Sequence, residues 1–330
     1  MLFGFDVKET PLKIFHLACA GLILSLPALV SAQSYPTKPI RLIVPLAASG
    51  GMDTTARGVS QSLSERLKQT VVVDNRPGAG GAIGAELVAH ADPDGYTLLM
   101  VSASFVVHPL LYRARYDPLR DFTPVTQASR QPYVLIVHPS VPAASVRELV
   151  AYAKANPGKL NYASAGNGSL IHLTTELFKS ATGIDIVHVP YKGMGATYTD
   201  MLGGRIQTAF PSIISVLPHV KIGKLRALGV TSRSRAPALP DAPTMQEAGV
   251  SGFEVTQWYG VVAPAKTPRA LVDRLQKEIA AVLLQPEVAQ RMAGDGSEPA
   301  SSTPAEFGAH IKAEIRKWGE VIRKAGIRAD

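Results

Sequence analysis

Residues 40–53 read Ile-Arg-Leu-Ile-Val-Pro-Leu-Ala-Ala-Ser-Gly-Gly-Met-Asp, and they contain the first structural unit of the chain. The run Ile40–Pro45 is short and apolar, as expected for a buried β-strand. The glycine pair Gly50-Gly51 interrupts the run, and Asp53 is a residue type that caps helices, here one predicted to extend to about Leu67. The stretch therefore predicts a strand, a glycine-rich loop and a helix, in that order.

The same order repeats immediately downstream. A second strand is predicted at Val71–Asp74, followed by a turn at Pro77–Gly81 and a helix that ends at about Ala89. A third strand, Tyr96–Val101, comes after another turn. Strands that alternate with helices in this way are typical of a mostly parallel sheet with helices on both faces.

The second half of the chain continues with short strands and amphipathic helices. The predicted strands are Tyr133–Val137, Asn161–Ser164, Ile186–Val189, Gln207–Phe210 and Leu225–Thr231. The predicted helices are Val146–Ala155, Leu170–Ser180, Ala196–Leu202, Pro268–Leu284 and Pro304–Ala325. The 330 residues are enough for two α/β domains. No linker rich in glycine, serine or proline divides them, so we expect crossing strands between the domains and a ligand cleft at the carboxyl ends of the strands.

The first 32 residues have the pattern of a secretory signal peptide. Lys8 and Lys13 precede an apolar run from Ile14 to Val30, and a small-x-small motif ends at Ala32. We predict cleavage after Ala32, which would leave an exported, periplasmic protein. The alternative is an uncleaved membrane anchor, but the run is short for a spanning helix, and polar residues and a proline interrupt it.

Charge and cysteine content exclude several function classes. The net charge of +8 suits an anionic ligand, but the basic residues form no dense run, so we expect no nucleic-acid partner. The single cysteine, Cys19, lies in the segment predicted to be removed. Its loss excludes catalytic thiols, cysteine–zinc sites and iron–sulfur clusters from the mature protein. The histidines form no close pair at ligand spacing, and we predict neither a metal nor a cofactor.

Three glycine-rich loops each link a strand to a helix start and are the candidate ligand site. They are Ile43–Asp53, Asn161–Ser169 and His188–Gly195. A helix start leaves backbone N–H groups unpartnered at the positive end of the helix dipole, and glycine lets an anion approach them. Asp53 and Ser169 are the predicted N-caps. Each loop alone could be an ordinary connection of an α/β sheet, but three together, one of them with Tyr191-Lys192, favour a carboxylate site.

The motifs of several enzyme classes are absent or incomplete. A dinucleotide fingerprint fails by one residue, because Ile83 stands at its third glycine position, and no Walker loop, H-E-x-x-H or G-x-S-x-G motif occurs. Ser169 and His172 lie three residues apart on one helical face, a spacing that a hydrolase could use, but no orienting acid is evident. We expect His172 mainly to pack in its helix, and we place Trp258 in the core.

Eight blocks of the sequence form a distinctive set. They are Tyr35–Pro45, Gly50–Asp53, Val73–Gly81, Asp94–Leu98, Tyr162–Ser169, Val189–Gly193, Gly223–Ser232 and Pro240–Thr244. Together they resemble the Bug-type receptors, the solute-binding subunits of tripartite tricarboxylate transporters. The resemblance implies a type II periplasmic-binding-protein fold, with two doubly wound α/β domains joined by two crossing strands. It places domain 1 at residues 33–133 plus 254–330 and domain 2 at residues 134–253.

The resemblance also implies which positions contact the ligand, chiefly through backbone groups and water. These positions are Ala47, Ser49, Gly50, Gly51, Asp53, Ser102, Ser104, Ser164, Gly166, Gly168, Ser169, Tyr191, Lys192 and Gly193, to which we add His172 and Pro211. Two positions depart from the family pattern. Ala48-Ser49 replaces a Pro-Gly pair, and Pro211 replaces an aspartate that often meets the distal end of the ligand. The missing aspartate argues against an amino-acid ligand and leaves di- or tricarboxylates and aromatic acids.

Taken with the resemblance, the sequence predicts a solute-binding protein, not an enzyme, that captures a small carboxylate outside the cytoplasm. Its expected partners are multi-spanning membrane subunits of a tripartite tricarboxylate transporter, and we expect a monomer that closes around its ligand. One alternative is a receptor that presents its closed form to a membrane signalling kinase, which would use the same closure. A second alternative is a hydrolase that uses Ser169 and His172.

Overall fold

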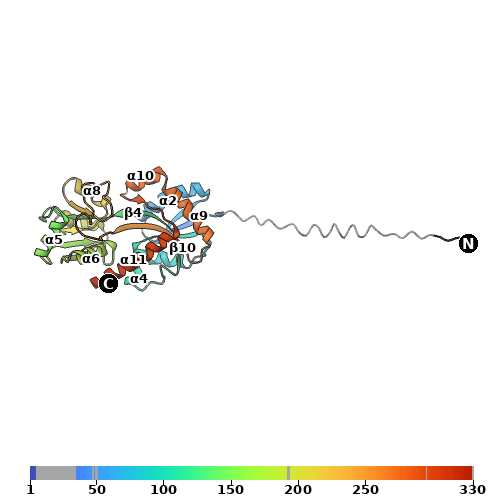
Figure 1. The fold of residues 1–330 in the computed structure, drawn as a ribbon, viewed down its shortest axis with the longest axis horizontal. Helices are drawn as coiled ribbons and strands as arrows, with labels where there is room; N and C mark the ends of the chain where they lie inside the picture. Colours follow the sequence, from blue (N-terminus) through green and yellow to red (C-terminus); the bar gives the residue numbers. More distant parts are fainter. Residues whose placement is uncertain (5–34, 47, 49–50, 192–193, 295, 329–330) are drawn as a thin grey trace. The chain divides into compact units, whose positions relative to one another are not determined.

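The computed structural model describes residues 1–4, 35–46, 48, 51–191, 194–294 and 296–328 (Figure 1). The chain divides into two units, Met1–Thr37 and Lys38–Asp330, and the helices and strands below belong to the second. The predicted cleavage after Ala32 lies outside the described residues. Within the part of the chain that the structure describes, each helix is too short or too polar to cross a bilayer.

The first sheet has six strands in the order β11-β4-β10-β3-β1-β2. Its parallel strands are β1 (Ile40–Val44), β2 (Val71–Asn75) and β3 (Thr97–Ser102). Its antiparallel strands are β4 (Phe122–Pro132), β10 (Thr256–Pro264) and β11 (Glu298–Pro299). The predicted parallel pairing is thus confirmed for one half of the sheet and wrong for the other. The cause is β10, which returns from a distant part of the chain and runs opposite to β3.

The second sheet has five strands in the order β7-β6-β8-β5-β9. These strands are β5 (Val134–Val137), β6 (Asn161–Ser164), β7 (Val187–Pro190), β8 (Thr208–Ala209) and β9 (Arg226–Val230). β6 runs parallel to β7 and β8, whereas β5 runs antiparallel to β8 and β9. This sheet is therefore also mixed, so both halves of the chain are α/β.

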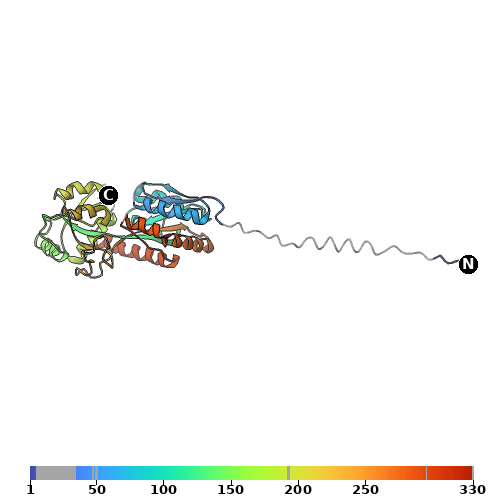
Figure 2. The same cartoon turned by 90° about the horizontal axis from the view of Figure 1, so that it is seen from above.

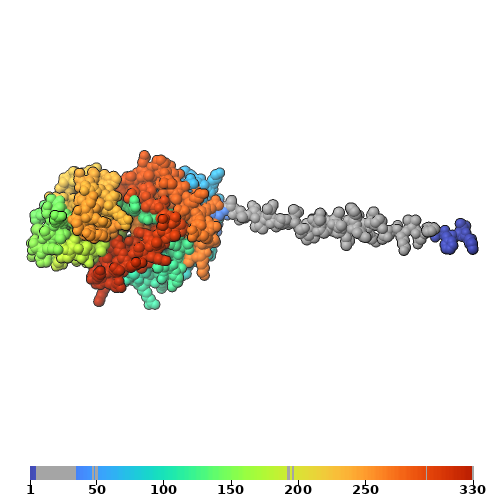
Figure 3. All heavy atoms as spheres, viewed as in Figure 1, coloured from blue at the N-terminus to red at the C-terminus, as the bar shows by residue number. Residues whose placement is uncertain are grey.

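The helices connect and cover the strands. They are α2 (Gly51–Leu67), η1 (Ala79–Gly81), α3 (Ala82–Ala89), α4 (Ala103–Leu111), α5 (Val146–Ala155), α6 (Leu170–Thr182), η2 (Met194–Thr197), α7 (Tyr198–Leu202), α8 (Ile213–Lys221), α9 (Arg269–Leu283), α10 (Pro286–Gly294) and α11 (Pro304–Ala325). α2, α3, α9 and α11 contact strands of the first sheet, and α6 contacts β6. α11 also packs against α6 and forms the red band on the face shown in Figure 3.

Several element boundaries agree with the prediction because local caps fix them. α11 begins with a capping box between Thr303 and Glu306, and Ser145 caps α5 by accepting a hydrogen bond from the Glu148 backbone N–H. No residue range was predicted for α4, α8, α10, β4 or β11. Pro109 and Pro218 inside α4 and α8 mask the helical pattern, and β4 mixes buried and exposed residues without strict alternation.

Two neighbouring strands carry the chain between the sheets. β4 and β10 pair antiparallel along nine residues of β10, from Pro264 beside Phe122 to Thr256 beside Pro132 (Figures 1 and 2). Just beyond this end, the Tyr133 N–H donates to Thr231 Oγ1 at 2.9 Å, and the Thr231 hydroxyl donates to the Val255 carbonyl. The two crossings are therefore tied to each other at the point where they enter the second sheet.

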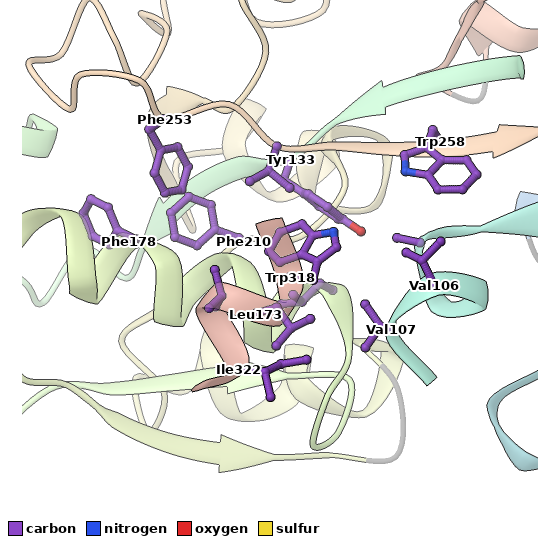
Figure 4. Packing of buried hydrophobic residues seen from close by; sticks show 14 of the residues in the cluster. Val106, Val107, Tyr133, Leu173, Phe178, Phe210, Phe253, Trp258, Trp318 and Ile322 are labelled. Carbon is purple, nitrogen blue, oxygen red and sulfur yellow. The ribbon is translucent and has the colours of Figure 1, made fainter. Parts of the chain in front are cut away.

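One hydrophobic cluster extends across both sheets. Figure 4 shows Phe178, Phe210 and Phe253 on one side of the cluster, Trp258 with Val106 on the other, and Tyr133 between them. Trp258 and Trp318 are fully buried, which confirms the predicted core position of Trp258. Both indole N–H groups donate to Oε2 of the buried Glu314, at 3.0 and 2.8 Å. The carboxylate thus links β10 to α11, since a buried acceptor is stabilised by such bonds.

Candidate functional site

A cavity of about 480 Å³ lies between segments that follow strands of the two sheets. Its lining residues are Ala79 and Gly80 of η1, Ser104, Val107, His108, Leu111 and Tyr112 in and just after α4, and the loop residues Asn167, Gly168 and Ser169. η1 follows β2, α4 follows β3, and the loop follows β6. The cavity therefore lies at the carboxyl ends of strands, where α/β sheets bind ligands.

The first wall is built where β3 passes into α4. Ser102 and Ser104 were both predicted site residues, and their hydroxyl oxygens are 2.9 Å apart. Ser102 is the N-cap residue of α4 and is 3% exposed, whereas Ser104 reaches the cavity. The structure therefore brings the pair together, with Ser104 at the surface of the cavity and Ser102 beneath it.

α4 contributes a part of the wall that was not predicted from the sequence. The His108 ring stacks on Tyr112 at 4.9 Å between centroids. Burial lowers the pKa of His108, and its Nδ1 is buried without a hydrogen-bond partner among the described residues. Val107 and Leu111 add apolar surface. The repeated order of strand, small polar residues and helix at residues 97–111 was the available signal, but the proline in α4 obscured it.

The second wall is the loop between β6 and α6. Gly166 and Gly168 adopt φ values of 119° and 70°, which side-chain-bearing residues rarely adopt. Ser169 caps α6, as predicted, because its Oγ accepts a hydrogen bond from the His172 backbone N–H at 3.3 Å. The first residues of α6 therefore present the positive end of the helix dipole at the cavity.

The two walls touch at Gly168. A Cβ atom built on Gly168 would lie 2.3 Å from Leu111 Cδ1, which belongs to the opposite wall. Atoms at that distance overlap, so only glycine fits between the loop and α4 as they stand. The same loop approaches a third segment, since a Cβ on Gly166 would lie 3.4 Å from the Tyr191 carbonyl oxygen.

Ser164 and His172 lie behind the loop. Ser164 is fully buried, and its hydroxyl is 2.6 Å from His188 Nε2 and accepts a hydrogen bond from the Gly166 N–H at 3.1 Å. His172 is 6% exposed, and its Nδ1 accepts from the Gly168 N–H at 3.1 Å. Its imidazole is thus turned to the loop backbone, while the Ser169 hydroxyl accepts from the backbone N–H of His172.

Asp53 is not the N-cap of α2, so that prediction is wrong. α2 begins at Gly51, which places Asp53 inside the first turn. Its carboxylate accepts hydrogen bonds from Arg57 Nε at 2.9 Å and from Asn75 Nδ2 at 3.0 Å. Asp53 therefore joins α2 to the end of β2. Gly51 lies close to Tyr259, whose hydroxyl would be 3.1 Å from a Cβ at this position.

The remaining predicted residues divide into two groups. The Tyr191 hydroxyl donates to Asp200 Oδ2 at 2.6 Å, and burial together with this bond raises the pKa of Tyr191 to about 12. Pro211 is buried beside the crossing strands, where its carbonyl accepts from the Val134 N–H at 3.0 Å. Five predicted residues lie outside the described part of the chain: Ala47, Ser49, Gly50, Lys192 and Gly193.

The chemistry of the described lining is neutral and largely apolar. It includes no lysine, arginine, aspartate or glutamate, so its donors are hydroxyl, amide and backbone N–H groups and one imidazole. Neutral donors at a helix start can hold a carboxylate without a paired cation. Among the described residues, no three histidine, cysteine or acidic side chains gather as metal ligands would.

The chain is similar to several known proteins over most of its length. A family model described as "Tripartite tricarboxylate transporter family receptor" matches residues 55–327. The protein BugT of Bordetella pertussis is 37% identical over 318 residues, which are 94% of this chain and 98% of BugT. The solved structure of R. palustris Rpa4515 with adipate is 38% identical with a TM-score of 0.77, covering 89% of this chain and 99% of that one. The periplasmic binding protein BugD is 37% identical with a TM-score of 0.74, covering 90% of this chain and 100% of that one.

Proposed function

The chain belongs to the family of tripartite tricarboxylate transporter receptors, and from this membership we propose that its cavity binds a small carboxylate outside the cytoplasm. The observation that carries the proposal is that the described lining residues are uncharged, with Ser104 facing the start of α6 across the cavity. A carboxylate there would meet hydroxyl and backbone donors and the positive end of a helix. The similar Rpa4515, solved with adipate, supports this ligand class.

The ligand contacts follow from the same geometry. We propose that Ser104, Gly168 and Ser169 contact the carboxylate directly, because they line the cavity. Ser102, Ser164 and Gly166 would shape the surface from beneath. Seven further positions remain predicted contacts: Ala47, Ser49, Gly50, Gly51, Tyr191, Lys192 and Gly193. Asp53 would affect binding indirectly, by positioning β2, and Pro211 would do so by positioning the crossing strands.

Closure of two domains would bury the ligand. We propose the predicted domains, residues 33–133 with 254–330 and residues 134–253, as the moving bodies. Their boundaries fall at the tied crossing formed by Tyr133, Thr231 and Val255. The contact between Gly168 and Leu111 would then be the place where the domains meet on closure. Hinge motion about a short segment of this kind is a common way to enclose a ligand.

The cellular role follows the family. Relatives are periplasmic binding proteins, and we propose that this chain reaches the periplasm after cleavage at Ala32 and passes its ligand, as a monomer, to membrane subunits of the transporter. We propose binding without catalysis, because the imidazole of His172 faces the Gly168 N–H rather than the Ser169 hydroxyl. A hydrolase nucleophile needs its base within hydrogen-bond reach of the hydroxyl.

A ligand screen tests the proposal. The protein purified from the periplasm of an expression host is heated with adipate, succinate, malate, citrate, tartrate, glutamate, nicotinate, benzoate or terephthalate. A ligand at 100 times its dissociation constant should stabilise the fold by about 2.7 kcal/mol, which raises the midpoint of unfolding. The corresponding amides, in which every carboxyl group is replaced, serve as matched controls that lack the carboxylate charge. Stabilisation by none of the acids, or equally by an acid and its amide, would overturn the carboxylate assignment.

A further inference from the structure

Two histidines stack face to face behind the cavity loop. The ring centroids of His172 and His188 are 3.9 Å apart, with 13° between the planes. The parallel register of β6 and β7 pairs Tyr162 with His188, and the first turn of α6 adds His172 to the stack. The Tyr162 ring continues the stack 4.8 Å from His188. The fold thus brings together two imidazoles that are 16 positions apart in the sequence.

Each imidazole holds one end of the loop. His188 Nε2 lies 2.6 Å from the hydroxyl of Ser164, at the start of the loop. His172 Nδ1 lies 3.1 Å from the backbone nitrogen of Gly168, at the far end. A backbone N–H can only donate, so this contact requires an unprotonated Nδ1 and a neutral His172 with its proton on Nε2. Gly168 lines the cavity, and its amide orientation therefore depends on the protonation state of His172.

A proton on His172 Nδ1 would oppose this arrangement. The imidazolium would present an N–H to the Gly168 N–H, and two donors cannot form a hydrogen bond. The loop end would have to move, because the φ of 70° at Gly168 and its contact with Leu111 leave little room for adjustment in place. A second proton on His188 is disfavoured, since two positive rings at stacking distance repel each other.

We propose that His172 and His188 are positioning residues that, in their neutral forms, hold the loop 164–168 in its binding shape, so that acidification releases the loop and weakens carboxylate binding. The proposal rests on the proposed function for the identity of the ligand. The loop positioning itself does not depend on the ligand and can be tested in the free protein.

The charged groups around the stack are engaged with one another. On α6 and β6, Glu176 accepts from the Tyr162 hydroxyl at 2.6 Å and pairs with Lys179 at 2.8 Å. Beyond β7, Tyr191 is bonded to Asp200. α11 packs on α6 and contributes three further charged groups near Glu176 and Lys179. These are Arg316, Lys317 and Glu320.

Two substitutions replace the hydrogen-bonding ring nitrogen of each histidine with an amide group that does not titrate. In His172→Asn the amide oxygen can stand in for Nδ1, and in His188→Gln the amide can stand in for Nε2. His172→Phe keeps an aromatic ring but removes the acceptor. His90→Gln is the matched control, because His90 is an exposed histidine at the end of α3.

The first measurement uses NMR on the protein without ligand. At pH 7.5, the imidazole nitrogen shifts of His172 should show an unprotonated Nδ1. Between pH 8 and 5, the Gly168 amide resonance should move with the titration of His172, and it should stay fixed in His172→Asn. A Gly168 amide that does not respond while His172 titrates, or a protonated Nδ1 at pH 7.5, would overturn the positioning role.

The second measurement is calorimetric affinity for adipate from pH 8 to 5.5. Wild type should lose about tenfold in affinity for each pH unit below the titration midpoint of His172, because the bound form excludes one proton. The variant with His172→Asn and His188→Gln should show a flat profile, His172→Phe should bind weakly at every pH, and His90→Gln should follow wild type. An equal acid loss in the double variant would refute the pH link. Failure of every acid in the screen would refute the proposed function, while the NMR result would still decide the positioning role.

Discussion

Replacing Gly168 with alanine should weaken ligand binding as well as the fold, through two separate contacts. At φ 70°, an alanine costs about 1 kcal/mol in unfolding free energy, because its Cβ crowds the backbone. The new Cβ would also lie 2.3 Å from Leu111 Cδ1, so Leu111 must leave its preferred rotamer when the walls meet, at about 1 kcal/mol. That second cost applies to the closed form, and it corresponds to roughly a five- to tenfold loss of affinity.

Gly183→Ala is the matched control for this substitution. Gly183 caps the other end of α6 with a φ of 68°, and the nearest atom to a Cβ there is Lys154 Cε at 4.0 Å. Urea unfolding should therefore show a similar loss of stability in both variants, and calorimetry with adipate should show weaker binding only in Gly168→Ala. Adding Leu111→Ala should restore much of the affinity. If Gly168→Ala and Gly183→Ala bind adipate equally well, the contact between the walls has no part in closure.

Three further predictions concern export, the core and acid stability. The intact mass of the exported protein, measured by mass spectrometry, should equal that of a chain that begins at Gln33. A larger mass would contradict cleavage after Ala32. Glu314→Gln should lower the unfolding free energy measured in urea by about 2 kcal/mol, because the buried acceptor of both indole N–H groups loses its charge. Glu320→Gln, at an exposed position, should change the unfolding free energy little. Equal effects of the two substitutions would contradict the structural role of Glu314. Burial lowers the pKa of His108, so its contribution to stability is present above the unfolded pKa of about 6.5 and is lost as the pH falls through the folded value. His108→Gln should therefore flatten the acid side of the curve of stability against pH, and an unchanged curve would contradict this.

The elements that could be predicted from the sequence are those with local causes. α5 and α11 follow from their caps, and β6 was predicted with its observed bounds directly before a glycine-rich loop. β4 could not be predicted in the same way, because its residues are buried by pairing with β10, more than 100 positions away. The mixed character of both sheets has the same long-range origin.

The loops of the candidate site could be predicted from the sequence, but the side-chain contacts between distant segments could not. Ser104, Gly168 and Ser169 lie at the cavity as predicted positions, since strand ends and helix starts are local features. The role of Asp53 was missed because its partner, Asn75, belongs to a separate strand. The apolar wall from α4 was missed because Pro109 obscures the helical pattern and because its place at the cavity depends on how the two halves of the chain pack.

The carboxylate of Glu314, shared by the two tryptophans, makes the intrinsic fluorescence of this protein a probe of its conformation. The chain has only two tryptophans, one on a crossing strand and one on the C-terminal helix, and both donate to the same acceptor. Their emission therefore originates at the base of the crossing and not at scattered surface positions. Any movement of β10 relative to α11 would change the surroundings of both indole rings. Intrinsic tryptophan fluorescence can therefore report a conformational change in the unlabelled protein.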